Sequence, residues 1–236
     1  MYSELMVGDD PQSSGRREEK VQERFGSTLG RRIVLLGTPL ALSVLMVFHP
    51  APYDDINGEL VPIAGWWTVL HTLQFVLFAL MGAALWMLTY GLSSSIALTL
   101  SRLAAAIFVV FYDAGDAIAG ISTGILAHAA QEGELAQRGA VAAIETIFHD
   151  PLKNGLFEIG EYAWVVALAT AGFALYRADA PRIPLVLLVV PAIFLKFFDH
   201  AFPYGSLAFG SFFVVACWLK LEWGRPTLAV RPRRVS

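Results

Sequence analysis

Residues 99–125 read TLSRLAAAIFVVFYDAGDAIAGISTGI, a long apolar stretch with two aspartates near its middle. A membrane helix needs about 20 mostly apolar residues to cross a hydrocarbon core of roughly 30 Å. The stretch meets that length, so it predicts a transmembrane helix. A charged carboxylate in lipid costs about 2.5–3.5 kcal/mol on an insertion scale. We therefore expect Asp113 and Asp116 to face protein, water or a cation.

The composition of the whole chain also favours a membrane protein. Of its 236 residues, 56% are hydrophobic and 16% are charged, against about 45–50% and about 25% in a typical soluble domain. These values and the net charge of −3 exclude a disordered chain and a basic nucleic-acid-binding protein. The single cysteine, Cys217, excludes an intrachain disulfide, a thiolate zinc site and an iron–sulfur cluster, because each needs several cysteines.

Five other apolar stretches accompany this one, so the sequence predicts an all-α, polytopic bundle of six transmembrane helices. The six predicted spans cover about 33–48, 66–90, 99–125, 156–176, 182–199 and 204–221. The last two are separated by so few residues that they must form an antiparallel hairpin. We expect a kink near Pro191, because proline removes one hydrogen bond from a helix and membrane helices tolerate that loss.

The basic residues predict the orientation of these spans. Of the 17 lysines and arginines, 14 fall on the side of the two termini, whereas the other side has Arg138 and Lys153, and Lys196 lies inside a span. Cytoplasmic loops carry an excess of Lys and Arg, so both termini are predicted to be cytoplasmic. The chain is thus expected to be an integral protein of the cytoplasmic or plasma membrane.

The predicted organisation has three parts. Residues 1–30 lack a sustained apolar run and predict a disordered cytoplasmic tail, residues 31–222 form the membrane domain, and residues 223–236 form a basic cytoplasmic tail. In the longest outer connection, residues 134–148 have apolar side chains near helical spacing with charges between them. This pattern predicts an amphipathic helix on the outer surface.

Small residues predict how the third span packs. Gly120 and Gly124 are four residues apart, and such a pair lets a second helix approach closely. We therefore expect the third span to be the central helix of the bundle, which would place its two aspartates on the bundle axis.

Polar side chains are predicted to form a layer in the outer half of the bundle. Residues three apart share a helix face, which pairs Asp113 with Asp116 in the third span. Lys196 is predicted at the depth of Glu161, and a structural ion pair of Lys196 with Glu161 or Glu158 is as well supported as a functional role. The predicted ion, proton or substrate site consists of Asp113, Asp116, Glu158, Glu161, Lys196, His71 and Gln74.

From this layer we favour proton- or cation-linked small-molecule binding or transport, because intramembrane carboxylates are the usual proton and cation carriers. The alternative is a zinc-type membrane hydrolase. Its predicted ligands, from several helices, are His71, Asp116, His149, Glu158 and His200, with an open position for water. No His-Glu-x-x-His motif occurs, so the residues do not decide whether the protein is an enzyme.

Two further hypotheses stay open. The chain could bind haem b through His49 and His71 and transfer electrons; the residues leave the cofactor open, with a divalent metal favoured over a haem. It could also be a structural subunit whose polar layer only fixes helix register. The expected partners are the lipid bilayer and, in a homo-oligomer, further copies of the chain. No nucleic acid is expected to bind.

Overall fold

The structure is a computed structural model that describes residues 29–50, 59–198 and 200–223. The predicted tails lie almost wholly outside these ranges, and so does Asp199. Within them every regular element is helical and no strand occurs, which confirms the all-α class. The elements are η1 (Ile33–Gly37), α2 (Thr38–Val47), η2 (Val61–Ile63), α4 (Ala64–Leu88), α5 (Ile96–Asp116), η3 (Ala117–Ser122), α6 (Thr123–Gln131), α7 (Gln137–His149), α8 (Pro151–Arg177), α9 (Arg182–Leu187), α10 (Val189–Phe197) and α11 (Tyr204–Trp223).

Four helical runs in the described part of the chain are long and apolar enough to cross a membrane. They are Leu29–Val47, Val61–Leu88, Ile96–Gln131 and Pro151–Arg177, and they contain most of the first four predicted spans. The fifth and sixth predicted spans do not meet that criterion. The fifth is divided into α9 and α10, and the sixth provides a shorter apolar helix, Tyr204–Leu219.

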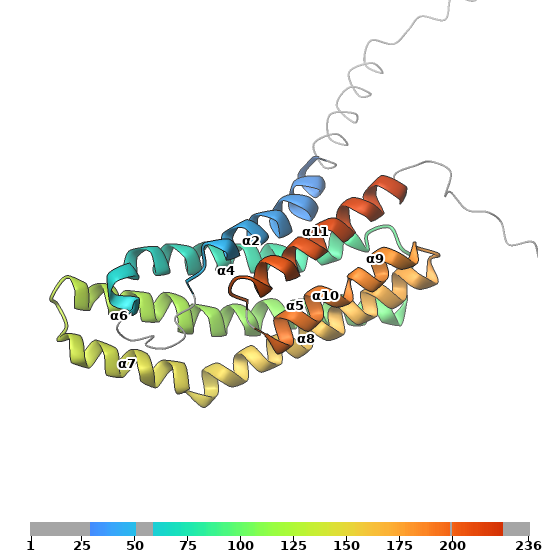
Figure 1. Cartoon of the computed structure of the whole chain (residues 1–236). Helices are drawn as coiled ribbons and strands as arrows, with labels where there is room; N and C mark the ends of the chain where they lie inside the picture. The colour runs from blue at the N-terminus through green and yellow to red at the C-terminus, as the bar shows by residue number, and fades with distance from the viewer. Residues whose placement is uncertain (1–28, 51–58, 199, 224–236) are drawn as a thin grey trace, which may run out of the picture.

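The division of the fifth predicted span lies where the sequence predicted a kink. α9 ends at Leu187 and α10 begins at Val189, two residues before Pro191. Proline has no N–H to donate to the preceding turn, so the regular helical hydrogen bonding is interrupted there. The two short helices still run alongside α8 and α11 (Figure 1).

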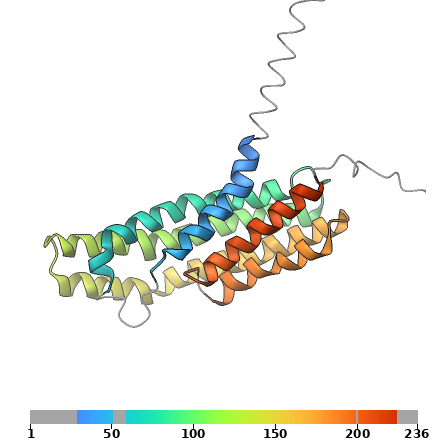
Figure 2. The ribbon, with the colours of Figure 1, turned by 45° about the horizontal axis from the view of Figure 1, so that its top comes forward.

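The helices run side by side along one long axis, and α6 and α7 extend past the connection between α10 and α11 (Figures 1 and 2). The run from Ile96 to Gln131 has 36 residues, about 54 Å at 1.5 Å per residue. This is well beyond the roughly 30 Å of a hydrocarbon core. α7 lies in the segment predicted to be amphipathic and packs its buried Ala140 and Ile144 toward α6.

Small residues allow the tightest helix pair, α5 with α8. A Cβ atom added to Gly160 would lie 2.8 Å from the backbone nitrogen of Tyr112, so α8 approaches α5 at this point because it carries no side chain there. Ala167 and Ala171 are fully buried further along α8. Ser101 Oγ donates to the carbonyl oxygen of Ala167 over 2.9 Å. Close backbone approach through small residues is how membrane helices associate without a hydrophobic driving force.

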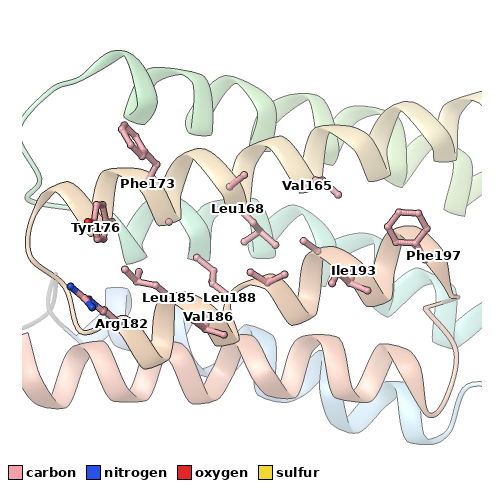
Figure 3. Close-up of a pocket in the computed structure, with 14 residues that line it drawn as sticks. Val165, Leu168, Phe173, Tyr176, Arg182, Leu185, Val186, Leu188, Ile193 and Phe197 are labelled. Atoms are coloured by element: carbon pink, nitrogen blue, oxygen red, sulfur yellow. The ribbon is translucent and has the colours of Figure 1, made fainter.

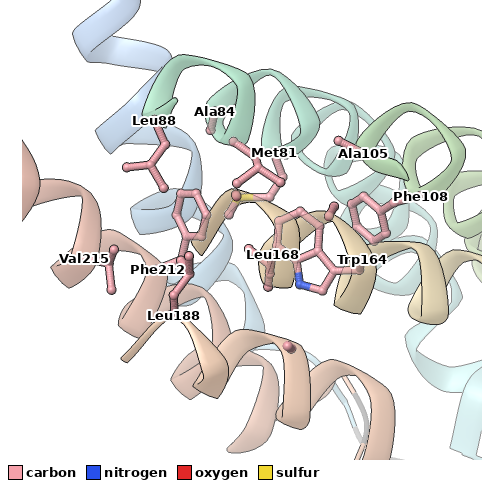
Figure 4. Packing of buried hydrophobic residues seen from close by; sticks show 14 of the residues in the cluster. Met81, Ala84, Leu88, Ala105, Phe108, Trp164, Leu168, Leu188, Phe212 and Val215 are labelled. Carbon is pink, nitrogen blue, oxygen red and sulfur yellow. The ribbon is translucent and has the colours of Figure 1, made fainter. Parts of the chain in front are cut away.

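The main core lies where α4, α5, α8 and α11 meet (Figure 4). Trp164, Phe108 and Phe212 are fully buried there, and the rings of Phe108 and Trp164 are 4.6 Å apart. Many large apolar side chains point outward instead, among them Ile96, which is 82% exposed. A bundle with a packed interior and an apolar outer surface is suited to a lipid environment.

Candidate metal centre

Three histidines come together although they are far apart in the sequence. His49 follows the end of α2, His71 lies on α4, and His200 lies between α10 and α11. Each offers a ring nitrogen, and these three atoms all lie within 4.8 Å of one another. A tetrahedral zinc ion with about 2.0–2.1 Å bonds would hold three such atoms roughly 3.3 Å apart. A small contraction of the cluster would therefore complete a three-histidine site.

Hydrogen bonds orient two of the three rings. His71 Nδ1 lies 2.8 Å from the carbonyl oxygen of Trp67, and His49 Nδ1 lies 2.6 Å from that of Pro50. A carbonyl oxygen can only accept, so Nδ1 carries the hydrogen in both rings and Nε2 has the lone pair in the neutral form. Metal-binding histidines usually donate their other ring N–H in this way. Both rings are therefore in the tautomer that binds metal through Nε2.

Asp116 brings a carboxylate beside this cluster. Its side chain is buried, and its Oδ1 lies 3.8 Å from Nε2 of His200. Asp116 is the last residue of α5, and the helix continues from it as the π-helical turn η3. Such π-helical turns inside longer helices are frequent at functional sites. The carboxylate is close enough to act on His200 or on a group bound by the histidines.

The two adjacent tryptophans connect the helices that carry the histidines. Trp66 Nε1 donates to the carbonyl oxygen of Phe48 over 3.1 Å, at the end of α2 and immediately before the first histidine of the cluster. The Trp67 ring lies 4.2 Å from the His71 ring, between centroids. Trp67 Nε1 donates to Thr123 Oγ1 over 3.1 Å. The Trp-Trp-x3-His sequence thus ties α2, α4 and α6 together around the cluster.

Two glycines make room for the side of α4 that carries His71. A Cβ atom on Gly120 would lie 2.0 Å from His71 Cδ2, and one on Gly124 would lie 2.2 Å from Thr68 Oγ1. A larger residue at Gly120 requires α4 to move, because its Cβ would also lie 2.6 Å from His71 Cβ, whereas one at Gly124 requires at least that the Thr68 side chain rotate. The glycine pair is therefore a packing surface for another helix, as its spacing predicted.

A cavity of about 540 Å³ opens beside the histidines. The walls combine ionisable side chains from α5 and α8 with apolar rings, and the Phe157 ring stacks parallel to that of His200 at 6.4 Å. The buried ammonium group of Lys153 donates to the carbonyl oxygen of Phe148 over 2.8 Å. The polar lining residues are His49, His71, Asp116, Lys153, Asn154, Glu158, Glu161 and His200.

Several residues of the predicted polar layer meet in this cavity. His71, Asp116, Glu158 and Glu161 line it. Lys196 Nζ donates to Glu161 Oε2 over 2.9 Å, so the ion pair that the sequence suggested is present. It joins α8 to α10.

Four predicted site residues do not line the cavity, and Lys196 is one of them, because it reaches the cavity wall only through its ion pair with Glu161. Gln74 is fully buried one turn beyond His71, and its Nε2 contacts Met46 Sδ at 3.4 Å. Asp113 is buried on α5 but is not part of the lining. His149 is exposed at the end of α7, and its Nδ1 bonds to the carbonyl oxygen of Glu145 at 2.9 Å. The prediction of His149 as a metal ligand is therefore wrong, because α7 turns this side chain outward.

His49 takes the place that the sequence analysis gave to His149. His49 ends the first predicted span, and nothing in that position distinguished it from the other histidines as a metal ligand. The sequence analysis assigned His49 only to a haem, together with His71. Their rings contact each other edge to face at 5.2 Å, whereas two axial ligands lie on opposite faces of a porphyrin between them. The arrangement fits a single small ion better than a haem.

The chain matches no protein-family model, no curated protein and no solved structure. Its function is therefore inferred from the chemistry of these residues.

Proposed function

We propose that the protein is a metal-dependent membrane hydrolase in which His49, His71 and His200 bind a zinc-type divalent cation. The observation that carries this proposal is the approach of three imidazole nitrogens to within 4.8 Å of one another. Imidazole suits zinc among the divalent metals. Three protein ligands with a fourth position open to water are typical of catalytic rather than structural zinc sites.

The metal would supply the nucleophile. Three neutral imidazoles would not compensate the 2+ charge of such an ion, so the ion would supply a bound water acidic enough to lose a proton near neutral pH. Asp116 is the carboxylate that lies beside the cluster, 3.8 Å from His200 Nε2, and we assign it as the base that accepts this proton. The adjacent cavity of about 540 Å³ has room for a substrate next to the metal.

We also propose that the bundle crosses the membrane six times with both termini in the cytoplasm, in a cytoplasmic-type membrane. The α9–α10 pair and α11 lie alongside the four long helices (Figure 1), and the basic residues fall mainly on the side of the termini, as the positive-inside rule requires. Under this topology the histidine cluster opens to the outer side.

Proton- or cation-linked transport is the second candidate, because Asp113 and Asp116 are both buried within one membrane-length helix. Buried intramembrane carboxylates are typical of ion pathways. The same pocket would then hold a cation in transit rather than a resident metal.

Elemental analysis of the purified full-length protein tests the metal centre. We expect about one zinc per chain after equilibration with zinc and removal of the excess. The His71→Ala and His200→Ala variants should lose it. His149→Ala is the matched control, because this exposed histidine lies outside the cluster, and it should keep the zinc. Wild-type protein without tightly bound zinc, or variants that all retain it, would overturn the proposal.

A further inference from the structure

A second cavity lies between α8 and the α9–α10 pair, and it differs from the metal cavity in chemistry. Its volume is about 560 Å³ and nearly all of its lining is aliphatic or aromatic. Figure 3 shows Tyr176 and Arg182 at one end of this groove and Phe197 at the other. The rim is open, since Phe197 is 73% and Val186 69% exposed.

Residues that line the apolar groove lie next to residues that line the metal cavity on α8 and α10. On α8, Val165 lines the groove and Glu161, one turn earlier, lines the metal cavity. On α10, Phe197 lines the groove, and the next residue, Phe198, lines the metal cavity. The ion pair between Lys196 and Glu161 therefore lies beside both linings: Glu161 lines the metal cavity, and Lys196 lies between Leu195 of that cavity and Phe197 of the groove.

The length of the groove suits a long hydrocarbon chain. From Arg182 to Phe197 the α9–α10 pair rises about 22 Å at 1.5 Å per residue, which is close to the extent of a long acyl chain and most of the roughly 30 Å hydrocarbon core. Arg182 provides a cation at the end farthest from the metal cavity. The lining between the ends has no charged group that would exclude a hydrocarbon.

We propose that the substrate is a membrane lipid with a long acyl chain, and that this chain occupies the groove while its ester group reaches the histidine cluster. The proposal rests on the metal-dependent hydrolase function. The metal-bound hydroxide would add to the ester carbonyl carbon, and the bond from that carbon to the alcohol oxygen would break. The alcohol would take up the proton that Asp116 received, and the acyl group would leave as a carboxylic acid whose remaining proton passes to water. Water is the co-reactant, and no oxidant or reductant is needed.

The Lys196–Glu161 pair would provide a hydrogen-bonding group on the route of the lipid from the groove to the metal cavity. A lipid that moved from the groove into the metal cavity would bring its ester oxygens past an ammonium group that is 12% exposed. That ammonium group can donate to a carbonyl or phosphate oxygen. An uncharged junction would offer the ester group no hydrogen-bond donor at the point where it leaves the hydrocarbon.

Photo-crosslinking tests the occupant of the groove. The probe is a phosphatidylcholine with a diazirine in its acyl chain, in nanodiscs that contain the full-length protein, and the labelled residues are mapped by mass spectrometry. We expect labels to concentrate several-fold on groove residues over exposed α4 residues such as Leu73 and Val76, which are 47% and 53% exposed. Equal labelling of all exposed apolar faces would overturn the proposal.

A matched pair of substitutions sharpens the test. Ala169 is exposed at the groove, so Ala169→Trp should fill it and lower groove labelling several-fold, while Ala79→Trp, at an exposed alanine of α4, should not. Zinc content, measured on the same samples, should be unchanged in both. If the label is spread evenly over all exposed apolar faces while zinc is bound, only the proposal that the groove holds the acyl chain would be overturned. Groove labelling without zinc in the wild-type protein would overturn the hydrolase and, with it, the role of the lipid as its substrate.

Discussion

The ring of His71 donates a hydrogen bond from Nδ1 to the carbonyl oxygen of Trp67, one turn earlier on α4, over 2.8 Å. This bond fixes both the tautomer and the direction of the ring, because the donor nitrogen must point along the helix toward its acceptor. Nε2 then carries the lone pair. Gly120 packs directly against the ring of His71. A side chain at that position should therefore affect metal binding as much as a change of the ligand itself.

Replacement of Gly120 by alanine should weaken zinc binding at least 10-fold without changing any ligand. The new Cβ would lie 2.0 Å from His71 Cδ2, so the ring or the whole of α4 must move, and loss of ligand orientation typically costs 10–100-fold in metal affinity. Zinc affinity is measured by competition with a fluorescent chelator. Gly139→Ala on α7, where nothing lies within 4 Å, is the control. Unchanged affinity in Gly120→Ala would mean that His71 does not bind the metal in this orientation.

Replacement of Asp116 by asparagine should separate metal binding from catalysis. The amide keeps the shape of the side chain but cannot accept a proton, so zinc content should stay near one per chain while ester hydrolysis falls by about 10²–10⁴-fold. Glu158→Gln, at a carboxylate of the same cavity, is the comparison and should lose far less activity. Asp116→Asn could instead lose zinc while the hydrolysis rate per remaining zinc ion equals that of the wild-type protein. The carboxylate would then be a metal ligand rather than the base.

The sequence predicts the parts of this molecule that depend on local pattern. The first four spans, the break before Pro191 and the close contact at Gly120 follow from apolar length, the missing proline N–H and the missing glycine side chain. The layer of His71, Asp116, Glu158 and Glu161 follows from the cost of charge in lipid. These features need no knowledge of which helix lies beside which.

The histidine cluster could not be predicted in the same way. His49 and His200 lie in or next to connections, so no helical period gives their direction, and they meet because α11 packs against both α2 and α10. His149 was predicted as a ligand from the sequence but lies on the exposed side of α7. Which histidines belong to the site is thus set by the packing of α11 against α2, a contact between helices far apart in the sequence.

Lower pH should release the metal and remove the stability that the metal provides. Imidazole binds zinc only in its neutral form, so protons compete with the ion for all three ligands and affinity falls as the pH falls. At pH 7.5, zinc at 100 times its dissociation constant should stabilise the folded protein by about 2.7 kcal/mol. We expect zinc to raise the thermal midpoint at pH 7.5 and to have little effect at pH 5. An equal shift at both values would point to carboxylate rather than histidine ligands.

Removal of one partner of the Lys196–Glu161 pair should destabilise the protein more than removal of both. The ammonium and carboxylate groups are 2.9 Å apart, with side chains 12% and 20% exposed, and a single substitution leaves the other charge without its partner in a poorly solvated place. Breaking a fully buried pair costs about 3–5 kcal/mol of folding free energy. Because both of these side chains are partly exposed, we expect Lys196→Met or Glu161→Gln to cost less than that. The double variant should recover part of the loss, because no uncompensated charge is left.

Thermal unfolding in detergent, read by circular dichroism, gives the four midpoints of a double-mutant cycle. Additive losses in the double variant would show that the two residues are not coupled in the folded protein. The pair would then have no part in joining α8 to α10.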